Sequence, residues 1–180
     1  MKKKTFSTRS MCIMAVCAAL YFVLTQFFTI RIANIRISIA CLPILVLAVL
    51  YGAKYAAISA IVGETAYQLL SYGLTATTVL WVLPSAARGV MVALGYALLT
   101  RSNLKPKTFR VWFLAVLILS AVITTVLNTG ITWLDSVIYH YYTKAYVFGD
   151  LGIRFVSGIL TALVMWVVLP PITKALRKFA

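Results

Sequence analysis

Acidic residues are nearly absent from this 180-residue chain, which contains three Asp and Glu against 17 Lys and Arg. It has one histidine, and its three cysteines, Cys12, Cys17 and Cys41, lie within apolar segments without a CxxC or Cys/His cluster. Paired carboxylates, a nucleophile beside a base and a glycine-rich phosphate loop are missing as well. The sequence therefore predicts no catalytic site, metal site or cofactor, and the cysteines are expected to be small buried residues.

Charge of either sign is rare over long stretches. Between Ile37 and Ala87 only Lys54 and Glu64 are charged, and the whole chain is 63% hydrophobic and 11% charged. Because a bilayer core requires about 20 apolar residues for each spanning helix, this composition predicts an all-α integral membrane protein. We expect residues 1–180 to form a single membrane domain, with no room for a soluble catalytic domain.

Charged or turn-rich breaks divide the chain into six predicted transmembrane helices. They lie near residues 9–30, 37–52, 55–72, 78–100, 109–134 and 150–174. The first is expected to be retained in the protein, because the uncharged run Met11–Ile30 is longer than the core of a typical signal peptide. The second is short for a full span and is expected to be tilted or broken.

The basic residues cluster in alternate gaps between these helices. With the N and C termini in the cytoplasm, most Lys and Arg lie on the inner side, as the positive-inside rule requires. The same distribution accounts for the net charge of +14, since no basic face is interleaved with exposed aromatics as nucleic-acid binding would require. We therefore expect a multi-pass protein of the plasma membrane that contacts lipid and no nucleic acid.

Glu64, Arg88 and Arg154 lie within the predicted helices, where a central charge costs roughly 3 kcal/mol unless it is paired or hydrated. One interpretation is a structural ion pair between Glu64 and one of the two arginines. The other is a small-molecule pocket open to the outside, because aromatic and polar residues fall at the same depth. The substrate-binding residues predicted on this second interpretation are Arg31, Arg36, Glu64, Tyr67, Gln68, Trp81, Arg88, Asn128, Trp133 and Arg154.

Two features of this pocket have a plainer alternative. Trp81 and Trp133 would fit an interfacial aromatic belt equally well. The segment Leu134–Phe148 is predicted to cover the site from outside, and its His140 is more typical of an interface residue than of a metal ligand.

Small residues mark a surface of the first predicted helix. Ala15 and Ala19 are four residues apart and share one face, where another helix can approach closely. Gly89, Ala93 and Ala97 form a similar stripe in the fourth predicted helix, where it serves internal packing.

These features together resemble the substrate-binding (S) subunit of an energy-coupling factor (ECF) vitamin transporter, over nearly the whole chain. The stretches most similar to the folate-specific members are Asn34–Pro43 with its Arg-Ile-x-x-x-x-Leu-Pro element, Tyr51-Gly52-Ala53, and Leu127-Asn128-Thr129 followed by Ile138-Tyr139. Two segments of the predicted pocket depart from the folate pattern. Gly63-Glu64 stands where an aspartate nearer the helix end is expected, and Leu83–Arg88 replaces a segment rich in glycine and phenylalanine.

The resemblance implies a subunit of the bacterial plasma membrane that binds a water-soluble vitamin from the extracellular side. It would then dock through the Ala15 and Ala19 face on a shared transmembrane coupling subunit that carries two ATPase subunits, so the chain itself would not be an enzyme. Folate is the favoured ligand, because arginines would receive its carboxylates and Glu64 or Asn128 its pterin N–H groups.

Other functions remain open at this stage. Pantothenate, biotin or riboflavin would fit the same role, and thiamin would rely on Glu64 and aromatic faces. A self-contained small transporter or channel, or a membrane-embedded enzyme or assembly factor, are the competing hypotheses. The first of these would need a polar stripe that continues to the cytoplasmic side, and the sequence contains no such stripe.

Overall fold

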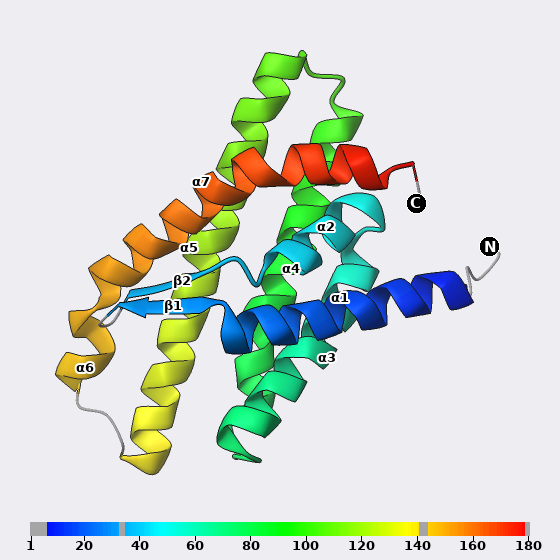
Figure 1. Cartoon of the computed structure of the whole chain (residues 1–180). Helices are drawn as coiled ribbons and strands as arrows, with labels where there is room; N and C mark the ends of the chain where they lie inside the picture. The colour runs from blue at the N-terminus through cyan, green and yellow to red at the C-terminus, as the bar shows by residue number, and fades with distance from the viewer. Residues whose placement is uncertain (1–6, 33–34, 141–143, 179–180) are drawn as a thin grey trace.

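The computed structural model describes residues 7–32, 35–140 and 144–178, and it describes no side chains at residues 30–37 or 141–146. The elements in chain order are α1 (Thr8–Phe27), β1 (Thr29–Ile32), β2 (Ile35–Ser38), α2 (Leu42–Leu50), α3 (Ala53–Tyr72), α4 (Thr78–Arg101), α5 (Pro106–Tyr139), α6 (Lys144–Gly149) and α7 (Leu151–Leu176). The start of α1 and the end of α7 lie on the same side of the molecule (Figure 1).

Four of the described helices, α1, α4, α5 and α7, are long and apolar enough to cross a membrane. They correspond to the predicted spans near 9–30, 78–100, 109–134 and 150–174. The predicted span near 55–72 corresponds to α3, which has 20 residues but a higher share of small and polar side chains. The length of an uncharged run therefore predicted the positions of the long helices.

The prediction of one helix over residues 37–52 is wrong in its first part. Ser38 belongs to β2, which pairs antiparallel with β1 so that Thr29 lies opposite Ser38 and Arg31 opposite Arg36. Isoleucines that alternate with other residues over this stretch favour a strand. The following helix, α2, has only nine residues, and Pro43 fits its first turn. The all-α prediction thus needs a small β-hairpin added to it.

The short helix α2 lies at the centre of the bundle, in contact with α1, α3, α4 and α7. Its side chains are apolar on every side, and Leu45 and Leu47 are at most 1% exposed. Gly52 joins α2 to α3 with φ +93°, a conformation that glycine adopts without the steric cost of a Cβ atom. Protein rather than lipid therefore surrounds α2, which explains how so short a helix is stable there.

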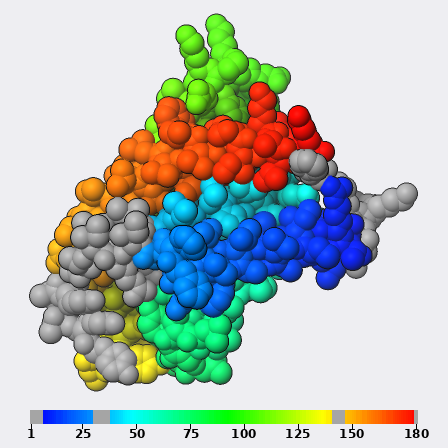
Figure 2. Space-filling model, in the orientation of Figure 1, coloured from blue at the N-terminus to red at the C-terminus, as the bar shows by residue number. Residues whose placement is uncertain are grey.

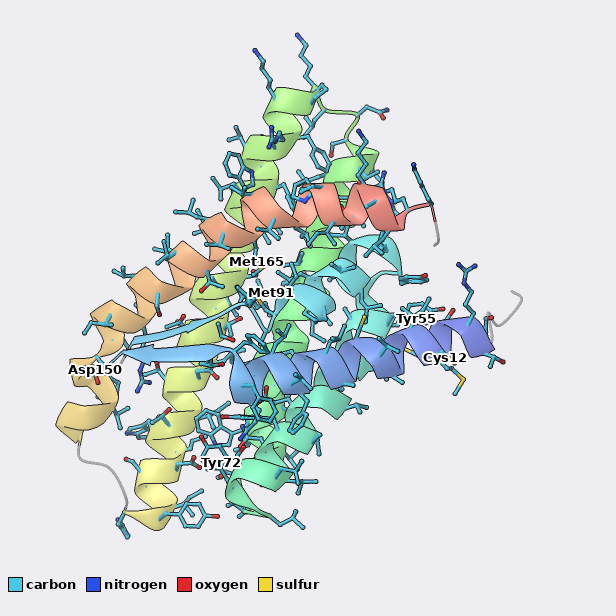
Figure 3. The ribbon with its side chains drawn as sticks, in the orientation of Figure 1. Cys12, Tyr55, Tyr72, Met91, Asp150 and Met165 are labelled. Carbon is cyan, nitrogen blue, oxygen red and sulfur yellow. The ribbon has the colours of Figure 1, made fainter. Side chains whose placement is uncertain are left out.

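The other helices form layers around this centre. α1 packs on α3, α3 on α4, α4 on α5, and α5 on α7. Met91 of α4 and Met165 of α7 lie in the middle of the bundle, and Met165 is 1% exposed (Figure 3). Cys12 points away from the bundle near the start of α1 (Figure 3) and is exposed, so the predicted burial of this cysteine is wrong.

The α4–α5 hairpin projects beyond the rest of the molecule, and α1 and α7 cover much of the face next to it (Figure 2). α5 contains 34 residues, which correspond to about 51 Å of helix, against about 30 Å for the hydrocarbon core of a bilayer. The basic residues Arg101, Lys105 and Lys107 are exposed at the turn of this hairpin.

Candidate ligand-binding site

A cavity of about 780 Å³ lies among α1, α2, α3, α4, α5 and α7. Its volume falls in the range of pockets that bury a drug-sized molecule. At one end its wall includes Thr75 and Thr77 of the α3–α4 connection and Asp150 at the start of α7. The wall thus combines helix side chains with residues of the connections on one side of the bundle.

The structure brings seven of the ten predicted site residues together in this wall: Glu64, Tyr67, Gln68, Trp81, Arg88, Asn128 and Arg154. Trp133 is not among the wall residues and is 43% exposed, as an interfacial residue would be. The side chains of Arg31 and Arg36 lie outside the described part of the chain. Of the segment Leu134–Phe148, the first part continues α5 to Tyr139 and is not a loop, and Tyr139 lines the cavity.

Glu64 of α3 is 7% exposed and receives hydrogen bonds from three side chains. Tyr21 of α1 and Ser85 of α4 donate to its Oε2, the second at 3.1 Å, and Gln68 donates to its Oε1 at 2.9 Å. In the part of the chain that the structure describes, Glu64 forms no ion pair with Arg88 or Arg154. Hydroxyl and amide groups donate to this carboxylate instead. Hydrogen bonds to a carboxylate are stronger than those between two neutral groups.

Arg88 and Asp135 carry polar atoms that are buried without a hydrogen-bond partner. These atoms are Nε and Nη2 of Arg88 and Oδ1 of Asp135. The other oxygen of Asp135 accepts a hydrogen bond of 2.8 Å from Nε1 of Trp81. Since the great majority of buried polar groups in proteins are paired, these atoms are exceptions within the described part of the chain.

A row of hydroxyl side chains forms another part of the wall. Thr124, Thr125 and Thr132 of α5 and Thr161 of α7 each donate to the backbone carbonyl four residues earlier, at 2.7 to 2.9 Å. Their hydrogens are therefore used within their own helices. What these side chains offer to a bound molecule is the remaining acceptor capacity of their oxygens.

Sequence reasoning missed Tyr21, Ser85, Asp135 and the threonines as wall residues. Tyr21 lies seven residues after Met14 and three after Ala18 on the buried face of α1, a spacing that predicts burial but no hydrogen bond. Asp135 belongs to the segment Leu134–Phe148, which was predicted to cover the site from outside. Its place in the wall follows from the continuation of α5 to Tyr139, which lies beyond the predicted end of this helix near residue 134.

Outside the cavity, Ala15 and Ala19 are exposed on α1. Val16, 59% exposed, and Leu20, 48% exposed, lie beside them. Met14, Ala18 and Tyr21 on the opposite face are buried. The small residues thus lie on a free helix surface, as close approach by another helix requires.

Residues 5–178 match the family described as "ECF-type riboflavin transporter, S component". The chain belongs to this family. Its fold is similar to that of a solved structure described as "Structure and mechanism of the S component of a bacterial ECF transporter", with a TM-score of 0.66 and 15% sequence identity over 94% of this chain and 98% of that chain. Among curated proteins, none matches the chain.

The predicted ECF S-component family is thereby confirmed, and with it the role of a substrate-specific subunit of a membrane transporter. The likeness to the solved S component supports the fold, since its sequence identity is only 15%. Folate as the ligand of this S component stays a prediction.

Proposed function

We propose that this ECF S component binds a water-soluble vitamin in the 780 Å³ cavity from the extracellular side. It then presents the vitamin to a transmembrane coupling subunit that carries two ATPase subunits. The observation that supports this function most is a large cavity with a polar wall inside the membrane domain of an S component. ATP hydrolysis is assigned to the partners, so the chain contributes selectivity alone.

The proposed orientation places both termini in the cytoplasm. The start of α1, the end of α7 and the α2–α3 turn with Lys54 lie on one side, and the β1–β2 hairpin and α6 lie toward the other (Figure 1). The cavity wall reaches the α3–α4 connection and Asp150 on the second side. In this arrangement α1, α2, α3, α4, α5 and α7 are the six proposed membrane helices, with α2 enclosed by protein.

The apolar packing in the inner half of the bundle favours a subunit that depends on partner proteins and argues against a self-contained channel. Leu117 of α5 and Met165 and Leu169 of α7 are at most 1% exposed there. Their apolar packing separates the cavity from the proposed cytoplasmic side. A channel would need polar or open residues at this depth.

Folate is the first proposed ligand. The guanidinium group of Arg88 belongs to the cavity wall and would receive one of its two carboxylates. Arg154 in the same wall would serve a second carboxylate.

Riboflavin is the second proposed ligand, because the family that matches this chain is described by riboflavin transport. Its hydroxylated side chain would donate to the row of threonine oxygens. A carbonyl oxygen beside a ring nitrogen, as in its ring system, would suit an arginine of the wall such as Arg88 or Arg154 in the way that the same pair of acceptors on guanine suits arginine.

Thermal unfolding of the purified chain in detergent tests the proposed function. A ligand that binds only the folded protein at 1,000 times its dissociation constant adds about 4 kcal/mol of stability, so folate or riboflavin should raise the melting temperature by several degrees. Thr124→Phe, which places a ring in the cavity, should remove the shift while the protein remains folded. A folded wild type that no water-soluble vitamin stabilises would contradict vitamin binding.

A further inference from the structure

We infer that the end of the membrane domain at the α4–α5 turn binds an anionic phospholipid. Arg110 of α5 contacts the lipid phosphate, and Trp166 of α7 holds the arginine in place. Neither residue belongs to the cavity wall. The inference therefore goes beyond the proposed function and does not depend on which vitamin the cavity binds.

Arg110 and Trp166 join α5 to α7 by two contacts. Cζ of Arg110 lies 5.4 Å from the centre of the Trp166 ring, within the roughly 6 Å of a cation–π interaction. Nε1 of the same ring donates to the backbone carbonyl of Arg110 at 2.9 Å. Because Arg110 is exposed, these contacts orient its guanidinium group and leave N–H groups accessible. A guanidinium group presents paired donors that match two oxygens of a phosphate.

Arg110 lies within a surface whose charged residues are all cations, which we call the basic surface. Its other exposed members are Arg101, Lys105 and Lys107 at the α4–α5 turn and Lys174, Arg177 and Lys178 at the end of α7. Nη2 of Arg177 donates to the hydroxyl of Tyr96 in α4, which holds the end of α7 beside the α4–α5 hairpin. The three acidic residues of the chain, Glu64, Asp135 and Asp150, all line the cavity instead. A cluster of uncompensated cations at a membrane surface attracts the phosphates of anionic lipids.

Two exposed tryptophans of α5 place the basic surface at a membrane boundary. Trp112 is 56% exposed and Trp133 is 43% exposed. Their positions in the chain differ by about 32 Å along the helix axis, which matches the roughly 30 Å of a hydrocarbon core. Tryptophan is enriched at both boundaries of that core. Arg110 lies about 3 Å beyond Trp112 along the axis, which is the level of the lipid headgroups.

The apolar side chains beside these cations favour a lipid over an acidic protein as the partner. Leu98 of α4 is 63% exposed and lies one turn before Arg101, and Val111 of α5 is 65% exposed and directly follows Arg110. A phospholipid covers both kinds of side chain, since its acyl chains contact the apolar ones and its phosphate contacts the cations. An acidic protein surface would match the cations alone.

Native mass spectrometry of the full chain in detergent tests the inference. The protein is titrated with phosphatidylglycerol and, separately, with phosphatidylcholine of the same acyl chains, and the fraction of protein with a bound lipid gives the two affinities. Since each nearby cation favours an anionic lipid by about fivefold, wild type should prefer phosphatidylglycerol by at least about tenfold. Inorganic phosphate, which has no acyl chains, should not displace the lipid.

Two substitutions test the contact between Arg110 and Trp166. Arg110→Gln removes the guanidinium group and should lower the preference for phosphatidylglycerol about fivefold or more. Trp166→Leu leaves every charge in place, and it should lower the preference about threefold because the guanidinium group is no longer held. The matched controls are Lys54→Gln, at an exposed cation of the α2–α3 turn, and Trp112→Leu, at an exposed tryptophan of α5. Both controls should keep the preference of wild type.

The alternative partners give different results. Equal affinity of wild type for the two lipids would overturn the lipid assignment, and this measurement needs no variant. If Arg110→Gln then reduced assembly with the coupling subunit, the basic surface would belong to a protein partner. Displacement by inorganic phosphate would show a site for a soluble anion. An equal effect of Lys54→Gln and Arg110→Gln would show attraction by net charge and would overturn the Arg110 site.

Discussion

Tyr21 of α1 donates its phenolic hydroxyl to Glu64 of α3, and the same hydroxyl lies 2.9 Å from Oγ of Ser85 in α4. The helix that carries the exposed Ala15 and Ala19 is thus joined by its buried face to the carboxylate of the cavity wall. This links the ligand site and the proposed docking surface through a single helix. We expect changes at the contact between α1 and α3 to affect both.

Removing the Tyr21 hydroxyl should destabilise the protein. Tyr21→Phe keeps the ring but takes one of three donors from the buried carboxylate, and a hydrogen bond to such a group contributes about 1.5–3 kcal/mol. Thermal unfolding of the unliganded protein in detergent measures the effect. Trp112→Phe, at a position that is 56% exposed, should leave the melting temperature unchanged, and an equal effect of both substitutions would contradict a special role for Tyr21.

The close contact between α1 and α3 depends on Gly63. A Cβ atom at this position would lie 2.9 Å from the backbone oxygen of Ala18 and from a ring carbon of Tyr21. Gly63→Ala should therefore push α1 outward and cost about 1–3 kcal/mol of unfolding free energy.

Gly130 of α5 provides the control for this substitution, because a Cβ atom there has nothing within 4 Å. Gly130→Ala should be neutral or should stabilise the helix by up to about 1 kcal/mol. A Gly63→Ala protein that unfolds at the same temperature as Gly130→Ala would show that α1 does not depend on this contact.

Bulky side chains on the small-residue face of α1 should separate binding from transport. Ala15→Trp and Ala19→Trp are expected to bind the vitamin with wild-type affinity but to reduce uptake at least about tenfold, since they prevent close helix approach. Uptake by cells that carry the partner subunits and one copy of this gene measures the effect. Val126→Trp, on the exposed face of α5, is the matched control, and normal uptake by both α1 variants would exclude the docking role.

Arg154 should matter for binding and not for insertion. Arg154→Ala removes a half-buried guanidinium from the cavity wall and should weaken binding of an anionic vitamin by about 10-fold or more. Its amount in the membrane fraction should match that of wild type. If Arg154→Ala weakens binding no more than Arg101→Ala on the exposed turn does, then Arg154 makes no contact with the ligand.

The long helices were predictable because an apolar run of about 20 residues has few stable structures in a bilayer besides a helix. Glu64 and Arg88 were predictable as wall residues because a charged side chain within a membrane helix is costly unless it faces the interior of the bundle or a hydrated cavity. The β1–β2 hairpin was missed although its alternating isoleucines favour a strand, because a short apolar run can also belong to a buried helix. The bond between Trp81 and Asp135 joins residues 54 positions apart, and no local pattern encodes such a pairing.

The threonines of the cavity wall are positions at which evolution can change the ligand preference without changing the fold. Because Thr124, Thr125 and Thr132 satisfy their hydrogens within α5, their hydroxyls contribute little to holding one helix against another. Valine has nearly the same shape, so exchanging a single threonine for it alters the polarity of the wall with little strain on the packing. A new vitamin preference is therefore accessible by a few substitutions on one helix face, while the packing around α2 that maintains the fold stays as it is.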